Sequence, residues 1–167
     1  LRRISLPELE RLLHPVGSFR TKARRLKELP DVVERLFAGQ IPRTVEELTR
    51  LPGVGRKTAS LVAAEAFQQP AIAVDVHVHR ICNRLGLLSS RTPAETEAAL
   101  WRLLPRRYWR TWNRYLVALG QTVCRPRHPR CAQCPILRFC TRRGVAPAPR
   151  QSPRSRAAHR RPALGVH

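Results

Sequence analysis

The sequence predicts an all-α fold, and three observations support this prediction. Apolar residues recur at helical spacing through most of the chain, and no stretch shows the alternation expected of a half-buried strand. Two segments carry capping-box signatures, which mark the starts of helices. The 167 residues, 43% of them hydrophobic, suffice to bury the core of one domain or of two small lobes. We therefore expect a helical protein with one or two compact units.

Helices are expected in a regular order along the chain. The first two cover residues 6–13 and 19–36, and Pro30 predicts a break or kink in the second. Thr44 starts a capping box for a helix that ends near Arg50. Later helices are expected over about 56–67, from Asp75 to Leu85, from the Thr92 capping box with Pro93 at its first position, and over about 108–122. Four aromatic residues at helical spacing favour core packing over base stacking: Trp101, Tyr108, Trp112 and Tyr115.

The charge of the chain points to a polyanionic partner. Its 32 basic and 11 acidic residues give a net charge of +21, and sixteen arginines follow Glu97, the last acidic residue. Genome composition accounts for arginine in place of lysine, but it does not account for the missing carboxylates. Nucleic acid is the first candidate partner. No apolar run approaches the ~18 residues of a membrane-spanning helix, and the N-terminus is not signal-like. We expect a soluble, monomeric, cytoplasmic protein with a polyanionic partner.

Lys57 is the first candidate for chemistry. It is one of three lysines beside 29 arginines, and it directly follows the turn in segment 51–58 (LPGVGRKT). Because arginine keeps its proton in proteins, only a lysine side chain can supply a neutral amine nucleophile. A Gly-x-Gly turn that enters a helix presents backbone N–H groups to a phosphate. Taken alone, however, such a turn is just as often a plain connection between two helices.

Asp75 is the candidate partner of Lys57, eighteen residues further along the chain. It lies in a valine-rich stretch, AVDVHV, where desolvation would raise its pKa and let it accept or relay protons near neutral pH. Its position also suits the N-cap of the next helix, and the two roles are compatible. His77 and His79 lack a third ligand at suitable spacing, so metal binding by these histidines is not expected.

Four of the five cysteines fall in a seventeen-residue span with the spacing C-x6-C-x2-C-x5-C: Cys124, Cys131, Cys134 and Cys140. Structural zinc sites usually show two close pairs, so the single pair favours a [4Fe–4S] cluster over zinc. Unrelated free thiols or disulfides are less favoured, and disulfides suit a secreted protein better. Cys82 is expected to be an ordinary buried residue. Phosphate contact is expected from the cations of this loop: Arg125, Arg127, His128, Arg130 and Arg138.

Together, the turn with Lys57, the valine-rich stretch with Asp75 and the cysteine spacing resemble the endonuclease III branch of the helix-hairpin-helix DNA glycosylase superfamily. The resemblance covers about residues 6–145 and implies two lobes with a DNA cleft between them. It implies that Lys57 and Asp75 are catalytic and that the four cysteines ligate a [4Fe–4S] cluster. It also implies that the hairpin binds DNA through Leu51, Pro52, Gly53, Val54, Gly55, Arg56 and Thr58.

The implied activity is that of a bifunctional DNA N-glycosylase and apurinic/apyrimidinic lyase of base excision repair. Such an enzyme removes oxidised pyrimidines from double-stranded DNA and cleaves the abasic strand by β-elimination, here through a Lys57 Schiff base. Arg56 and partial desolvation are expected to favour the neutral amine. Two further hypotheses are an adenine-mismatch glycosylase, a branch that generally lacks the lysine, and a non-catalytic DNA-binding iron–sulfur remnant.

The expected domain organisation has three parts. Residues 1–70 form a partial helical domain with the hairpin, 71–145 form a helical lobe with the cluster loop at 124–140, and 146–167 form a disordered basic tail. Relatives carry further helices before the point at which this chain starts. The chain contains no Met, and it is expected to be N-terminally incomplete.

Overall fold

The computed structural model describes residues 1–146, and every regular element within them is helical, which confirms the all-α prediction. The α-helices are α1 (Leu6–Leu13), α2 (Phe19–Phe37), α3 (Val45–Leu48), α4 (Arg56–Ala66), α5 (Val76–Leu85), α6 (Pro93–Leu103) and α7 (Trp109–Thr122). Short 3₁₀ turns follow at Arg106–Tyr108, Cys131–Gln133 and Leu137–Phe139. Among these helices, none combines the length and the apolar character needed to cross a bilayer. The predicted tail, 146–167, lies outside the described residues except for Ala146.

The helices begin where the sequence predicts, because polar side chains cap them. Thr44 and Thr92 accept the N–H groups of Glu47 and Glu95, so both predicted N-caps are confirmed. Two details differ from the prediction. Helix α3 already ends at Leu48, and α2 continues past Pro30 to Phe37, so of the predicted break or kink the break is absent.

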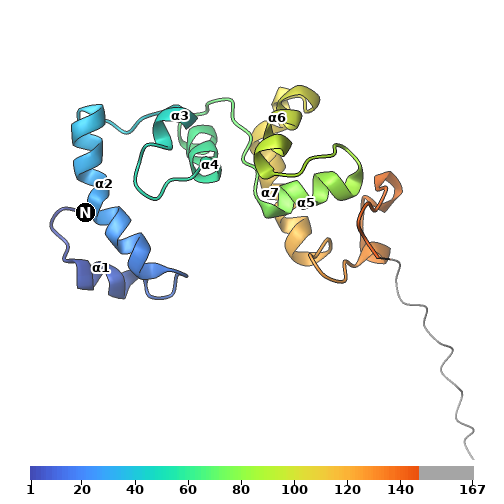
Figure 1. Cartoon of the computed structure of the whole chain (residues 1–167), viewed down its shortest axis with the longest axis horizontal. Helices are drawn as coiled ribbons and strands as arrows, with labels where there is room; N and C mark the ends of the chain where they lie inside the picture. Colours follow the sequence, from blue (N-terminus) through green and yellow to red (C-terminus); the bar gives the residue numbers. More distant parts are fainter. Residues whose placement is uncertain (147–167) are drawn as a thin grey trace, which may run out of the picture.

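The described residues contain two hydrophobic cores. The hairpin core joins α2, α3 and α4, and its buried members are Val33, Leu48, Leu51, Ala59, Ala63, Ala64 and Ala71. The second core joins α5, α6 and α7, and its buried members are Ile72, Val74, Val78, Ile81, Cys82, Leu88, Leu100 and Leu116. Figure 1 shows α1–α4 grouped on one side and α5–α7 on the other, joined by the segment between α4 and α5. The division into domains at these positions stays a prediction.

Fewer aromatic side chains pack in the core than the sequence predicted. Trp109 and Trp112 pack against the second core, and the Trp109 indole donates to the carbonyl of Leu104 at 2.8 Å. The prediction of core packing is wrong for three residues, whose exposed fractions are 41% for Trp101, 43% for Tyr108 and 61% for Tyr115. For Tyr115 the physical reason is that the core-facing stripe of α7 is already completed by Trp109, Trp112, Leu116 and Leu119.

Candidate active site

The glycine turn before α4 has the backbone geometry that an anion site needs. Gly53 has a φ of +77°, and a Cβ there would lie 3.1 Å from the Cβ of Arg25, so only glycine fits. Gly55 is the N-cap of α4, with open space around its missing Cβ and no side chain that caps the helix. The first N–H groups of α4 have no intrahelical acceptor, so an approaching phosphate could accept from them.

The predicted DNA-binding residues of the hairpin fall into different environments. Gly53, Gly55 and Thr58 are exposed, and Pro52 and Val54 are partly buried. Leu51 is buried in the hairpin core, and its carbonyl accepts the N–H of Val54 at 3.1 Å. The Leu51 side chain therefore packs inside the hairpin core and does not face solvent, while its carbonyl closes the turn.

Lys57 and Asp75 meet across the junction of the two cores. The Lys57 Nζ lies 2.9 Å from Asp75 Oδ2. The other carboxylate oxygen, Oδ1, accepts the N–H groups of His77 and Val78 at 2.9 and 3.0 Å. Asp75 thus caps α5 with one oxygen, as predicted, and contacts the Lys57 amine with the other, while its catalytic role stays a prediction. The Lys57 side chain is 46% exposed and the Asp75 side chain only 8%, which leaves the amine accessible above a buried carboxylate.

The two other lysines are bound differently. Lys22 donates to the carbonyl of Gly17 at 2.6 Å. Lys27 donates to three carbonyls near the start of the chain, the shortest contact being 2.8 Å to Ile4. Lys57 is therefore the lysine that a carboxylate holds, at the start of an uncapped helix.

The electrostatics of Asp75 correct one prediction. Burial does act to raise its pKa, as expected from the surrounding valines. The hydrogen bonds from the Val78 and His77 N–H groups and the contact with the Lys57 ammonium outweigh burial, so the pKa of Asp75 lies below its ordinary value. Asp75 is consequently a carboxylate at neutral pH. It suits the stabilisation of positive charge better than the storage of a proton.

The segment before Asp75 is held rigidly. Residues 71–74 are all buried, and the side chain of Asn113 on α7 donates to the carbonyl of Ala73 at 3.1 Å. After Asp75, the two histidines are engaged within the protein. His79 lies 2.6 Å from the hydroxyl of Thr96, and His77 lies 3.2 Å from the Arg80 guanidinium. These contacts give the histidines structural partners.

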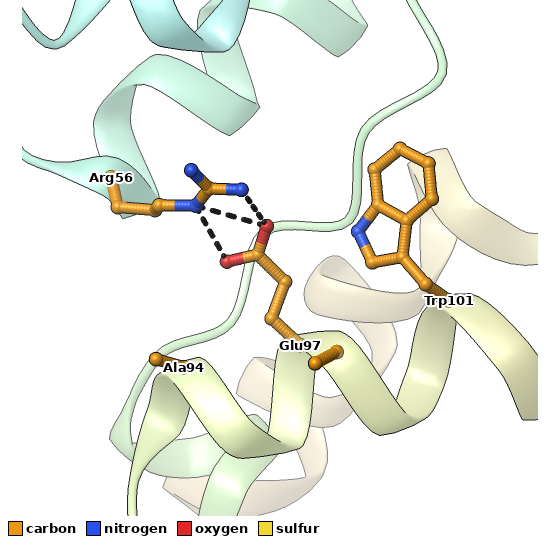
Figure 2. Close-up of a pocket in the computed structure, with 5 residues that line it drawn as sticks. Arg56, Ala94, Glu97 and Trp101 are labelled. Carbon is orange, nitrogen blue, oxygen red and sulfur yellow. Dashed lines mark hydrogen bonds and ion pairs between the residues drawn. The ribbon is translucent and has the colours of Figure 1, made fainter.

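Arg56, the residue between Gly55 and Lys57, forms an ion pair with a carboxylate of the second core. Figure 2 shows its guanidinium turned to the carboxylate of Glu97 on α6, with Nε and Nη2 donating over 2.9–3.1 Å. This contact raises the pKa of Arg56. The guanidinium of Arg56 is thus engaged within the protein, and its predicted contact with DNA stays a prediction.

Glu97 was missed by the sequence reasoning, although a signal was present. It stands on the same helix face as Leu100, three residues later, and its side chain is only 9% exposed. An acidic residue on the apolar face of a helix requires a partner, and the partner was not identifiable from spacing alone.

The four clustered cysteines line one hollow, together with Arg84, Val123, Pro129, Leu137, Arg142 and Val145. Two arginines of α5 attach this segment to the second core. Arg80 donates to the carbonyl of Cys124 at 2.8 Å, and Arg84 donates to those of Arg125 and Pro126 at 2.7 and 2.8 Å. The cysteine segment is therefore docked on the helix that Asp75 caps.

The spacing of these thiols bears on what they could hold. Within residues 1–146, no three His, Cys, Asp or Glu side chains are arranged to share one metal ion. A [4Fe–4S] cluster binds each cysteine at a different iron, so its ligands need not converge on a single ion. The four thiols around one hollow are the donor set that such a cluster takes. Cys82 lies apart in the second core, where burial raises the pKa of its thiol to about 11.

Comparison with known proteins places these features in a family. The family described as HhH-GPD superfamily base excision DNA repair protein matches residues 1–106. Endonuclease III of Thermotoga maritima is 44% identical over 133 residues, which are 80% of this chain and 62% of that protein. A solved non-covalent endonuclease III–DNA complex matches with a TM-score of 0.75 and 37% identity, over 83% of this chain and 65% of that one. A trapped endonuclease III–DNA covalent intermediate matches with the same TM-score and identity. The chain spans less than two thirds of the length of these relatives.

Proposed function

Because the chain belongs to the endonuclease III family of the HhH-GPD superfamily, we propose that it is a bifunctional DNA N-glycosylase and apurinic/apyrimidinic lyase. Its proposed substrate is double-stranded DNA that carries oxidised pyrimidines or abasic sites. The observation that carries the proposal is the 2.9 Å contact between Lys57 Nζ and Asp75 Oδ2 beside an uncapped helix start.

In the first step, Lys57 attacks the sugar. The neutral amine adds to C1′ of the damaged nucleotide, the C1′–N bond to the base breaks, and the base leaves with the bonding electron pair. Positive charge develops on the sugar as that bond lengthens. The Asp75 carboxylate, ionised and fixed by two backbone N–H groups, is placed to stabilise this charge.

In the second step, the Schiff base drives strand cleavage. The C1′–O4′ bond of the sugar ring breaks, O4′ takes a proton, and a protonated imine forms between Lys57 and C1′. This imine acidifies the C2′ proton, whose removal is followed by loss of the 3′ phosphate through β-elimination. Water then hydrolyses the imine and restores the free amine. The exposure of Lys57 supports this sequence, since a nucleotide flipped out of the duplex must reach Nζ from solvent.

The proposed resident cofactor is a [4Fe–4S] cluster held by Cys124, Cys131, Cys134 and Cys140. The four thiols around one hollow support it, and so does the similarity of the chain to endonuclease III proteins. When bound, the cluster would fix the cysteine loop as a structural unit. The cations of that loop are exposed, as the proposed contact with phosphates requires: Arg125, Arg127, His128, Arg130 and Arg138.

Borohydride trapping tests the proposed activity directly. The purified chain is incubated with a duplex that contains one abasic site, the imine is reduced, and the adduct is located by peptide mass spectrometry. We expect a covalent adduct on Lys57, and a duplex with thymine glycol should yield the same adduct. Binding of the duplex without any adduct would indicate a non-catalytic DNA-binding protein. Release of adenine from a mispair without trapping would indicate an adenine glycosylase.

Removal of one proposed cluster ligand is expected to remove the iron. In Cys131→Ser, the visible absorption of thiolate-ligated iron–sulfur centres should be lost, together with iron and acid-labile sulfide measured by elemental and colorimetric analysis. Cys82→Ala is the matched control, because Cys82 is buried away from the hollow and should leave the iron content unchanged. Retention of zinc in place of iron in the unaltered chain would contradict the proposed cofactor.

A further inference from the structure

The contact between Arg56 and Glu97 joins the two cores beside the proposed nucleophile. Arg56 is the first residue of α4 and belongs to the hairpin side, whereas Glu97 lies on α6 and belongs to the second side. The guanidinium donates three hydrogen bonds to the carboxylate, from Nε at 3.1 Å to each oxygen and from Nη2 at 2.9 Å to Oε1. The pair borders a cavity of about 430 Å³ that Ala94, Ala98 and Trp101 complete (Figure 2).

The burial of Glu97 shows that this is not an ordinary surface ion pair. Its side chain is 9% exposed, so removing its charge from water is costly, and a well-packed apolar residue would serve stability at least as well. By contrast, the second acid near Arg56, Glu46, is 76% exposed and lies 3.7 Å from Nη1. The buried carboxylate instead fixes the orientation of Arg56, because a side-on pair with Nε and Nη2 sets the plane of the guanidinium.

Adjacent residues of α4 reach two different helices of the second core. Successive side chains on an α-helix diverge by about 100°, so Arg56 turns to α6 while Lys57 turns to the N-cap of α5. Either contact alone would tie the first turn of α4 to the second core at one point. Two contacts from neighbouring residues to separate helices fix both the position and the rotation of the first turn.

The two contacts differ in what the reaction does to them. As Lys57 becomes an imine, its nitrogen bonds to the sugar and its ion pair with Asp75 is altered. Arg56 and Glu97 take no part in bond making or breaking. Their contact can therefore keep α4 aligned with α5 through the steps in which the lysine contact changes.

We propose that Glu97 is a positioning residue, which holds Arg56 and thereby sets the first turn of α4 so that the Lys57 amine faces Asp75 and the bound nucleotide. This inference rests on the proposed function. It adds to that function a residue outside the glycine turn, the lysine and the aspartate. Loss of the carboxylate should therefore slow formation of the Schiff base without weakening the binding of DNA.

Single-turnover trapping on a saturating abasic duplex separates alignment from stability. The amplitude reports the fraction of competent protein, and the rate constant reports how well competent protein aligns the amine. For Glu97→Gln, which keeps the shape of the side chain and removes its charge, we expect a fall of about tenfold in the rate constant, with a Kd for intact duplex within about twofold of the unaltered chain. A purely structural role would lower the amplitude and the melting temperature and leave the rate constant unchanged.

The matched control is Glu65→Gln at the other end of α4. Glu65 also pairs across to the second core, with Arg110 at 3.7 Å, but it is 61% exposed and distant from Lys57 along the helix. The trapping rate constant of Glu65→Gln should equal that of the unaltered chain. Arg56→Gln should slow trapping about as much as Glu97→Gln, and the double variant should be no slower than either, since both remove one contact.

The outcomes distinguish the two proposals. If the unaltered chain forms no adduct, the proposed function fails. If the unaltered chain traps and Glu97→Gln traps with the same rate constant, the positioning role is overturned and the proposed function stands. Should Glu97→Gln not fold, Glu97→Asp keeps the charge but shortens the side chain by one methylene. An unchanged rate constant in Glu97→Asp and in Arg56→Gln would likewise overturn the positioning role.

Discussion

Replacement of Lys57 by glutamine is expected to abolish borohydride trapping and to slow strand cleavage at abasic sites more than about 10³-fold. The amide of glutamine is not nucleophilic and cannot form an imine with C1′. Its N–H group can still donate to Asp75, and the replaced side chain is 46% exposed. The free energy of unfolding should therefore change by no more than about 1 kcal/mol, as measured by urea denaturation.

The same substitution at Lys22 is the control for Lys57→Gln. Lys22 is exposed and donates to the backbone carbonyl of Gly17, away from any carboxylate. Lys22→Gln should trap abasic DNA as fast as the unaltered chain. Adduct formation that survived in Lys57→Gln would show that another amine is the nucleophile, with Lys22, Lys27 and the N-terminus as the candidates to be mapped.

Replacement of Asp75 by asparagine is expected to slow trapping about 10²-fold while leaving the fold intact. Asparagine is as good an N-cap as aspartate, so the hydrogen bonds from His77 and Val78 should persist. What disappears is the negative charge beside Lys57, which stabilises positive charge on the sugar as the base departs. Single-turnover trapping gives the rate, and circular dichroism gives the helix content.

Asp75→Ala separates the charge of the side chain from its capping role. It removes both, so its trapping should fall as far as that of Asp75→Asn, while its free energy of unfolding should drop by about 1 kcal/mol more. If Asp75→Asn traps at the rate of the unaltered chain and only Asp75→Ala is impaired, Asp75 acts as a cap and has no electrostatic role in the reaction.

The pH dependence of stability tests whether the pKa of Asp75 is lowered in the folded chain. Its folded pKa is lower than its ordinary value of 3.8, so its contribution to stability is present above that value and is lost as the pH falls through the folded pKa. The difference in unfolding free energy between the unaltered chain and Asp75→Asn should be constant down to about pH 5 and then shrink in acid. A difference that grew on acidification would contradict the lowered pKa.

Local sequence patterns accounted for most of the fold. The capping boxes at Thr44 and Thr92 and the cap at Asp75 start helices where they were predicted, because a cap needs only a side chain and the N–H groups two or three residues ahead. Local rules were less informative for the aromatic residues. Trp109 and Tyr115 have similar local surroundings, and only the approach of α5 and α6 decides which of them is covered.

In the candidate site, too, some features were predictable from the sequence and others were not. Lys57 on a glycine turn, Asp75 among valines and the cysteine spacing were recognisable in the sequence, because each motif is short and chemically distinctive. The lowered pKa of Asp75 was not recognisable, since it depends on how burial competes with hydrogen bonds and charge from three partners in the folded chain. Glu97 was also missed, because its partner lies 41 residues away in the chain.

By itself, the sequence determined the helical class, the family and the side chains able to supply an amine, a carboxylate and four thiols. Only the tertiary structure decided how they are combined: Lys57 on Asp75, Arg56 on Glu97, and the cysteine loop on α5. The physical reason is the separation along the chain over which each kind of interaction acts. Capping and helical spacing act over a few residues, whereas ion pairs and burial depend on distances between helices that are far apart in the chain.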